Sequence, residues 1–478
     1  MANFYVENFG CRAAQADGRA IEEQLRCRGL EPAGCAESAT LVVLNTCAVT
    51  ASAEQDARAA IRRIRRANPG CEVIVTGCYA QRAPQEVAAL PGVSRVIGNS
   101  HKPNLAQIAL GPHSEKDSSK QAPLVPLSSL TLPPEQSIFV SDIFAHTELL
   151  AAPVFDGPRE RTRPNLKVQD GCNQRCSFCI IPFLRGPSRS LGLEEVLAQV
   201  NKLVAAGYRE VVISGINLGR WGRDLSPEGP RPPKLEDLVR AILDRTALRK
   251  LRISSVEPMD WSDSLIRLMA GSSRIAKHAH VPLQSGSDGV LRRMHRKYRP
   301  WHYRETVEKI RAAMPGASLG ADVMVGFPGE TGAEFDETCR MIEALPLTYL
   351  HVFTFSARPG TPAASMPAQV PVNLRRERNR ILRDLAAEKK QAFMRGFLGE
   401  RLEAITLGAA FEEGEGTWTR ALTDNYLKLR LKGRHESNHW LEARVDAVAG
   451  EELVGEPAAG PFDTLNLAPA VPKTSPIL

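Results

Sequence analysis

Three cysteines in a Cys-x-x-x-Cys-x-x-Cys spacing constrain this chain more than any other feature: Cys172, Cys176 and Cys179, here called the first cysteine set. Three thiolates this close together can each bind one iron of a single [4Fe–4S] cube, because soft sulfur ligands suit iron–sulfur clusters. The fourth iron then stays open to another ligand. A closed zinc site needs four ligands, and no further cysteine or histidine stands nearby at zinc-finger spacing. The spacing therefore favours a reactive iron–sulfur centre over a zinc knuckle or three packed thiols.

Three further cysteines each follow a predicted strand in the first hundred residues. Strands are predicted at 3–9, 40–45 and 72–76 with helices between them, which indicates a doubly wound parallel sheet. They run into the second cysteine set, which consists of Cys11, Cys47 and Cys78. The carboxyl ends of strands in such a sheet line one crevice, so these three residues can converge. Spacing alone leaves open whether they bind metal or are small buried side chains.

The pattern of elements changes twice along the chain. From residue 161 strands and helices alternate in about six units, fewer than the eight of a closed barrel, so a partial (β/α)6 barrel is predicted. Short strands between 399 and 457 then predict a small β-barrel. The expected organisation is α/β, with an N-terminal domain at 1–110, a linker at 111–160, a central domain at 161–396, a C-terminal β-domain at 397–457 and a tail at 458–478.

Composition and charge indicate the cellular compartment of the protein and the kind of partner it can bind. The 478 residues carry a net charge of +7, which is compatible with a polyanionic partner. The N-terminus lacks a basic segment followed by an apolar core, and no apolar run approaches the length of a membrane span. We therefore expect a cytoplasmic protein without a membrane partner. Ten cysteines in a reducing compartment are unsuited to disulfides, so several should be metal ligands.

The first cysteine set and its flanks carry a family resemblance. Phe178 stands before the last cysteine, and residues 167–171 and 180–183 flank the set. This stretch resembles the radical S-adenosylmethionine (SAM) superfamily and, within it, the methylthiotransferases. The resemblance implies that the open iron binds the amino and carboxylate groups of SAM, and that one electron cleaves SAM to a 5′-deoxyadenosyl radical. The segments around the second cysteine set are similar to those that hold a second [4Fe–4S] cluster in this family.

The resemblance also implies a cofactor pocket at the strand ends of the central domain. Ser214 and Gly215 stand where relatives contact the amino group of SAM. The residues expected to line the pocket for cofactor or substrate are Phe178, Ser214, Gly215, Glu257, Gln284 and Asp322. The first cysteine set is expected to be catalytic, and both sets are expected to be metal ligands.

Two segments indicate an RNA partner. Residues 422–426 resemble the TRAM domain, an RNA-binding module, although residues 399–457 hold 7 Lys+Arg against 12 Asp+Glu and are acidic as a whole. The basic stretch 291–311 is interleaved with Tyr298, Trp301 and Tyr303. Cations neutralise phosphates and aromatic rings stack on unpaired bases, which fits RNA, while a solvated basic face stays open as an alternative.

The likeness extends over nearly the whole chain and lies nearest the MtaB-like branch of the family. Members of that branch add a methylthio group at C2 of N6-threonylcarbamoyladenosine 37 in the tRNA anticodon loop. The expected cofactors are two [4Fe–4S] clusters and SAM, with flavodoxin or ferredoxin as electron donor and no DNA partner. Three alternatives stay open: action on isopentenyladenosine in tRNA, action on a ribosomal-protein aspartate, and an iron–sulfur RNA-binding protein without turnover.

Overall fold

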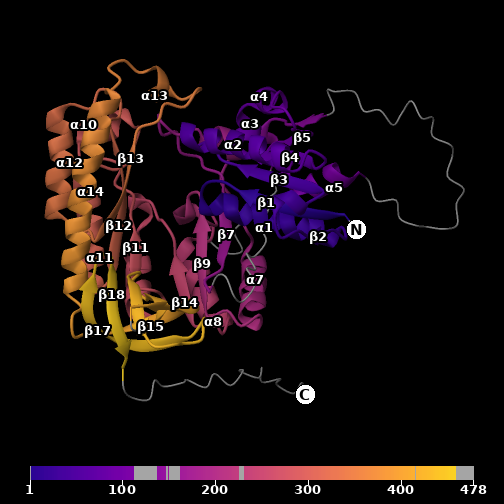
Figure 1. Cartoon of the computed structure of the whole chain (residues 1–478). Coiled ribbons are helices and arrows are strands. Elements are labelled where there is room, and N and C mark those ends of the chain that lie inside the picture. Colours follow the sequence, from indigo (N-terminus) through magenta and orange to yellow (C-terminus); the bar gives the residue numbers. More distant parts are fainter. Residues whose placement is uncertain are drawn as a thin grey trace, which may run out of the picture.

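The computed structural model describes residues 2–111, 137–146, 149, 162–225, 231–414 and 416–458. Most of the predicted linker at 111–160 and nearly all of the predicted tail lie outside the described residues. The chain forms three sheet-based bodies, and the N-terminal and C-terminal ones flank the central domain (Figure 1). The N-terminal sheet lies beside one edge of the central domain, and the C-terminal β-barrel lies beneath it.

The N-terminal domain is a six-stranded sheet in the order β2-β1-β3-β4-β5-β6, with every neighbouring pair parallel. The prediction of a doubly wound sheet is confirmed, because helices cover both faces. Ile21 and Leu25 of α1 pack on one face, whereas Ile61 and Ile64 of α2 pack on the other. The elements are β1 (Asn3–Asn8), α1 (Arg12–Cys27), β2 (Glu31–Pro32), β3 (Leu41–Thr46), α2 (Ala51–Ala67), β4 (Glu72–Gly77), α3 (Cys78–Arg82), α4 (Pro84–Ala88), β5 (Arg95–Ile97), α5 (Leu105–Leu110) and β6 (Ile138–Phe139).

The central domain is the predicted partial barrel of six parallel strands. Its two sheets run β8-β7-β9-β10 and β11-β12-β13, and parallel bridges from β10 to Ile275 and from Ser255 to β11 connect them. The strands are β7 (Asn165–Asp170), β9 (Glu210–Gly215), β10 (Lys250–Ile253), β11 (His278–His280), β12 (Ser318–Val325) and β13 (Tyr349–Thr354), with β8 (Arg189–Ser190) antiparallel at one edge. Among the described residues β13 has no partner beyond β12.

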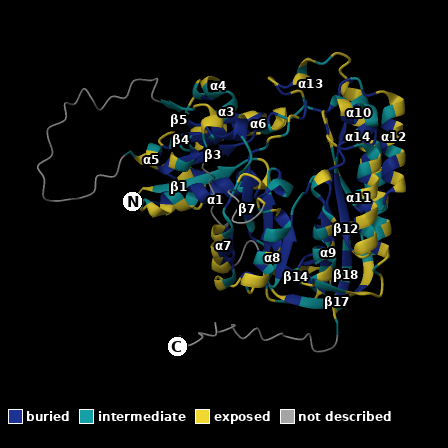
Figure 2. Ribbon diagram, turned by 180° about the vertical axis from the view of Figure 1, so that it is seen from behind, coloured by how far each residue is buried: buried dark blue, intermediate teal, exposed yellow. Residues whose placement is uncertain are grey.

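Helices enclose this barrel from outside, with buried inner faces and exposed outer faces (Figure 2). Their apolar stripes follow the helical period; α7, for example, buries Val196, Leu197, Val200 and Leu203. The helices are α6 (Ile181–Arg185), α7 (Leu193–Ala205), α8 (Leu235–Arg245), α9 (Asp263–Gly271), α10 (Asp288–Arg293), α11 (Pro300–Ala313), α12 (Gly332–Ala344), α13 (Pro362–Ser365) and α14 (Val372–Arg395).

Five strands close the C-terminal β-barrel in the order β14-β15-β16-β18-β17. They are β14 (Arg401–Glu413), β15 (Gly416–Thr423), β16 (Lys428–Lys432), β17 (Trp440–Ala449) and β18 (Glu452–Pro457). The β-barrel caps the amino ends of the central strands, where Lys250 pairs with Glu403 at 2.7 Å and Asn425 donates to the Gly316 carbonyl. The carboxyl ends, from which the cysteine loop emerges, lie at the opposite side. Within the described part of the chain, no helix has the length and apolar character needed to cross a membrane.

Candidate active site

The second cysteine set follows three neighbouring strands of the N-terminal sheet. Cys11 comes after β1, Cys47 after β3 and Cys78 after β4, at the edge where the winding of the sheet reverses. Gly10 has a φ of +96°, and a Cβ added to it would lie 2.8 Å from the Cys47 sulfur. Only glycine therefore lets the first loop pass this close to Cys47.

Nitrogen donors point at the buried sulfurs of this set. The Val49 amide lies 3.4 Å from Cys47 Sγ, and Asn99 Nδ2 lies 3.6 Å from Cys78 Sγ. Hydrogen bonds of this kind to cysteine sulfur tune iron–sulfur clusters. Burial raises the pKa of Cys47 to about 11, so this group is a neutral thiol until a metal displaces its proton.

The first cysteine set occupies the loop that leaves β7. Gly171 turns this loop with a φ of +71°, and a Cβ there would lie 2.0 Å from the Pro187 carbonyl oxygen. Cys172 Sγ accepts from the Gln174 amide at 3.4 Å, and Cys176 Sγ accepts from Arg296 Nη1 at 3.3 Å. Burial raises the pKa of Cys179 to about 12. Both sets thus combine buried thiols with N–H donors.

The short helix α6 connects the two cysteine sets. It begins two residues after Cys179, and Ile180 and Leu184 pack into the apolar core of the N-terminal domain beside Cys78. Asn99 Nδ2, which faces Cys78, also donates to the Leu184 carbonyl at 2.8 Å. The structure therefore brings the two predicted metal-binding loops to opposite sides of one helical turn.

No group of three His, Cys, Asp or Glu side chains in the described part of the chain could hold a single metal ion. A four-iron cube makes a different demand, because each cysteine binds its own iron and the sulfurs lie farther apart. The donor chemistry of both sets, in which thiols lie beside N–H groups, suits such a cube.

The ends of the central strands carry polar atoms that have no partner. Ser214 Oγ, Asn217 Oδ1 and Gln284 Oε1 are buried and accept or donate no hydrogen bond within the described residues. A buried polar atom without a partner costs free energy, and a polar ligand would remove that cost. A Cβ added to Gly215 would lie 2.7 Å from Gln169 Oε1, so the end of β9 passes closer to Gln169 of β7 than a side chain would allow. This environment fits the amino, carboxylate and hydroxyl groups of SAM.

The remaining predicted pocket residues lie at different heights in the barrel. Glu257 follows β10 and pairs with Arg296, the same arginine that contacts Cys176. Asp322 lies in the middle of β12, 3.2 Å from His280 Nε2 and deeper than the strand ends. The Phe178 ring stands edge-on to Phe327, with centroids 6.5 Å apart. Glu257 is thus tied to the first cysteine set, whereas Asp322 belongs to a lower layer.

Two family models match the chain. That of the Radical SAM superfamily covers residues 166–342, and that of the Uncharacterized protein family UPF0004 covers residues 3–98. The threonylcarbamoyladenosine tRNA methylthiotransferase MtaB of Bacillus subtilis is 36% identical over 91% of this chain and 92% of its own length. The MtaB of Aquifex aeolicus is 34% identical over 90% and 97%. The chain belongs to the radical SAM methylthiotransferase family. It is therefore a transferase enzyme.

A further family member and a solved structure are also similar to this chain. The tRNA-2-methylthio-N(6)-dimethylallyladenosine synthase of Novosphingobium aromaticivorans is 33% identical over 84% of this chain and 86% of its own length. Among solved structures, the radical SAM methyltransferase TsrM of Kitasatospora setae superposes with a TM-score of 0.52 at 16% identity, over 76% of this chain and 75% of that one. That likeness supports the α/β fold. Membership of the radical SAM superfamily implies SAM and a [4Fe–4S] cluster as cofactors.

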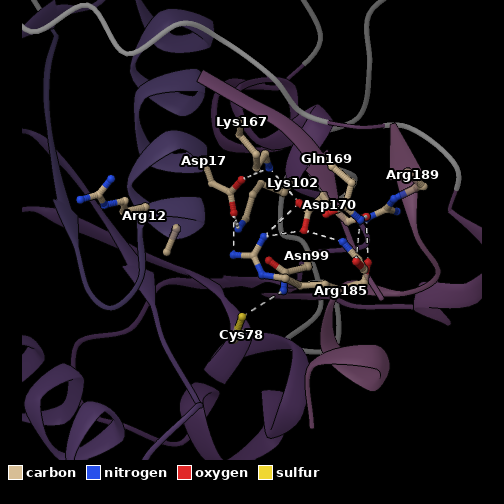
Figure 3. A network of polar contacts seen from close by, with 12 residues as sticks. Arg12, Asp17, Cys78, Asn99, Lys102, Lys167, Gln169, Asp170, Arg185 and Arg189 are labelled. Atoms are coloured by element: carbon tan, nitrogen blue, oxygen red, sulfur yellow. Dashed lines mark hydrogen bonds and ion pairs between the residues drawn. The ribbon is translucent and has the colours of Figure 1, made fainter. Parts of the chain in front are cut away.

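A buried network of five charged side chains joins the two cysteine-bearing domains of this family member (Figure 3). Asp17 of α1 contacts Lys102 at 3.0 Å, Lys167 of β7, and Arg185 of α6 at 3.0 Å. Asp170 completes the network through Lys167 at 2.8 Å and Arg185 at 3.0 Å. We call these residues the interdomain charge network. All five side chains are at most 8% exposed, so they hold the domains together away from solvent.

The stability of this network should depend on pH. Burial alone would raise the pKa of Asp17 and Asp170, but the neighbouring cations outweigh it and hold both pKa values well below the ordinary range. Unfolding therefore takes up protons, and the stabilisation present at neutral pH is lost as pH falls from about 5 downward. Denaturant unfolding at several pH values should show this loss, with a shallower slope for Asp17→Asn. Equal slopes would contradict the assignment.

The structure corrects one predicted RNA surface. Tyr298 and Tyr303 were expected to stack on bases, but both are buried and donate their hydroxyls to the carbonyls of residues 281–283. Arg296 is buried beside Cys176 rather than exposed to phosphate. Trp301 alone of the three aromatic residues is exposed, at 56%. The apolar helical spacing of Tyr303, Val307 and Ile310 was the signal for a core-facing stripe.

Sequence reasoning also missed the interdomain charge network and Arg296. A usable signal was present in β7, because a central parallel strand is normally apolar on both faces. Lys167 and Asp170 interrupt that pattern and require buried partners of opposite charge. Their partner Asp17 lies on another domain, and nothing local in the sequence identifies it.

Proposed function

We propose that this protein is a tRNA methylthiotransferase that adds a methylthio group to C2 of N6-threonylcarbamoyladenosine 37, using two [4Fe–4S] clusters and two molecules of SAM. The observation that carries this proposal is the pair of cysteine sets on either side of α6. One centre accounts for radical formation, and a second accounts for sulfur. The substrate is the one named for the relatives from Bacillus subtilis and Aquifex aeolicus.

We assign each group of residues a role in binding the cofactors. When bound, SAM and the clusters supply the radical and the sulfur needed at an aromatic C–H that no side-chain base can ionise. Cys172, Cys176 and Cys179 would hold one cluster, and Cys11, Cys47 and Cys78 the other. Ser214, Gly215 and Gln284 would orient SAM, with Phe178 and Glu257 beside it and Asp322 below it toward the middle of β12. Arg296 would fix Glu257 and donate to the Cys176 sulfur.

The proposed RNA partner is supported by a cavity of about 1090 Å³ between the central barrel, α14 and the C-terminal β-barrel. Six cationic side chains line it, against three acidic ones, and Tyr349, His351 and Tyr426 add rings. Phosphates and an unpaired base suit such a surface. The cations are Arg163, Arg380, Arg383, Lys390, Arg420 and Lys428.

The proposal also includes the domain limits, the cellular compartment and the electron donor. The proposed domain limits are 1–110, 161–396 and 397–457, with the last as a TRAM-like module; the N-terminal sheet also takes in β6 at Ile138–Phe139, within the proposed linker. We place the enzyme in the cytoplasm, where tRNA is modified, with a small protein such as flavodoxin or ferredoxin as reductant.

An anaerobic assay tests the function. The reconstituted enzyme, dithionite, SAM and a sulfur source are incubated with anticodon stem-loops that carry threonylcarbamoyladenosine or isopentenyladenosine at position 37. We expect 5′-deoxyadenosine together with the methylthiolated threonylcarbamoyl nucleoside, detected by mass spectrometry. If only the isopentenyl RNA is methylthiolated, the proposed substrate is wrong and the activity is that named for the Novosphingobium relative. If no 5′-deoxyadenosine forms, the hypothesis that this protein cleaves SAM is wrong.

A further inference from the structure

Arg12 immediately follows Cys11 and points away from the interdomain charge network (Figure 3). Its guanidinium donates to the hydroxyl of Tyr426, a residue of the C-terminal β-domain, at 3.1 Å. Its own carbonyl accepts from Asn165 Nδ2 at 3.4 Å, which fixes the backbone beside β7. Arg12 thus reaches from the second cysteine set across the open side of the central barrel.

The charge of Arg12 is not neutralised. Within the described residues the guanidinium forms no ion pair, and its one side-chain hydrogen bond goes to a neutral hydroxyl. A guanidinium has five N–H donors in a fork that matches a carboxylate, so most of its donors stay available. The side chain is exposed at this opening. A cation with free donors beside a proposed catalytic centre is suited to bind an anionic substrate group.

Aromatic and imidazole rings surround the contact with Tyr426. The Tyr426 ring lies 4.6 Å from that of His278 and 6.1 Å from that of Tyr349. Two residues farther along β11 and β13, the His280 and His351 rings stack with their centroids 5.5 Å apart. We call these five rings the ring floor. Tyr349, His351 and Tyr426 also line the 1090 Å³ cavity, so an unpaired base can reach their faces.

The Arg252 guanidinium lies 5.2 Å from the Tyr426 ring centre, but it is buried and already paired with Glu210. Burial lowers the pKa of His278 and His351, and Arg12 itself contributes to both shifts. These imidazoles are therefore neutral at pH 7. Asp322, the carboxylate of this layer, lies 3.2 Å from His280 Nε2. Arg12 remains the available cation where Cys11 meets the ring floor.

We propose that Arg12 recognises the carboxylate of the threonylcarbamoyl group while the modified adenine rests on the ring floor. The inference rests on the proposed function and names how that site selects its substrate. An isopentenyl group has no charge and gains nothing from Arg12, whereas a threonylcarbamoyl carboxylate can accept two charge-assisted hydrogen bonds. Arg12 would then be a specificity residue that also orients the base toward Cys11.

The test compares three anticodon stem-loops that carry threonylcarbamoyladenosine, isopentenyladenosine or adenosine at position 37. Their dissociation constants are measured on the cluster-loaded full chain with SAM. Because a hydrogen bond to a charged group contributes about 1.5–3 kcal/mol, Arg12→Gln should weaken binding of the threonylcarbamoyl RNA about tenfold to hundredfold. Binding of the other two RNAs should stay unchanged, and Arg12→Lys should recover part of the loss.

Controls separate this role from damage to the neighbouring cysteine. Iron content and RNA-independent formation of 5′-deoxyadenosine should match the parent enzyme, and Arg62→Gln on the exposed face of α2 should change nothing. If Arg12→Gln binds less iron than the parent, Tyr426→Phe provides a second test. It removes the hydrogen bond that holds the Arg12 guanidinium without changing the segment that carries Cys11, and it should reduce the preference for the threonylcarbamoyl RNA.

Two outcomes would overturn the inference. One is an equal loss on all three RNAs, which would mean a general phosphate contact. The other is a parent enzyme that binds the threonylcarbamoyl RNA no better than the unmodified one. Selective binding without methylthiolation would instead overturn the proposed function and leave the role of Arg12 intact.

Discussion

Replacing Asp17 with alanine is expected to lower the free energy of unfolding by about 3–5 kcal/mol, the loss typical of breaking a buried ion pair by removing one partner. Asp17 contacts three cations. Its removal leaves Lys167 and Arg185 with Asp170 as their carboxylate partner, and leaves Lys102 without a carboxylate partner among the described residues. Water cannot solvate these groups, since all are nearly fully buried. Denaturant unfolding of the full chain measures the loss.

A second substitution tests the electrostatic cause. Lys102→Met removes one of the three cations, so the double variant Asp17→Ala/Lys102→Met should be more stable than the sum of the single losses predicts. Asp56→Ala, on the exposed face of α2, is the matched control and should stay within about 0.5 kcal/mol of the parent. If Asp17→Ala costs no more than Asp56→Ala, the network does not stabilise the domain interface.

The sequence predicted the sheets well because their strands are continuous apolar runs. Leu41–Leu44 and Val73–Val75 are buried on both faces, so short β-branched and leucine-rich stretches revealed them directly. Cys47 and Cys78 follow such runs, whereas Cys11 follows the less apolar strand β1, and parallel strands end at one edge. The approximate position of the second cysteine set therefore followed from local pattern and one topological rule.

Contacts between the domains could not be predicted in this way. Asp17 and Lys167 are 150 residues apart, and neither local composition nor periodicity relates them. The same holds for Arg12 and Tyr426, which are separated by 414 residues. The misread Tyr298 and Tyr303 show the converse error, because a basic stretch drew attention to charge. The helical spacing of Tyr303 with Val307 and Ile310 already indicated burial of that ring.

Separate substitutions in the two cysteine sets should have different effects on the reaction. Cys47→Ala is expected to abolish the methylthiolated nucleoside while 5′-deoxyadenosine is still formed, because the first cysteine set stays complete. Cys176→Ala should abolish both products, since Cys176 belongs to the centre that would cleave SAM. Each variant should lose about half of the iron of the reconstituted parent. Mass spectrometry of the RNA digest and iron analysis measure these outcomes.

Cys27→Ala is the control for general thiol loss, because Cys27 is exposed at the end of α1 and its thiol donates to Glu23 of the same helix. It should retain both products and all iron. Cys47 lies in the domain that Arg185 and Asp17 dock onto the central barrel, so its loss removes a ligand without removing that docking. Methylthiolated product from Cys47→Ala at the parent rate would mean that sulfur is not delivered from the second cysteine set. A loss of 5′-deoxyadenosine in the same variant would mean that the two centres do not act separately.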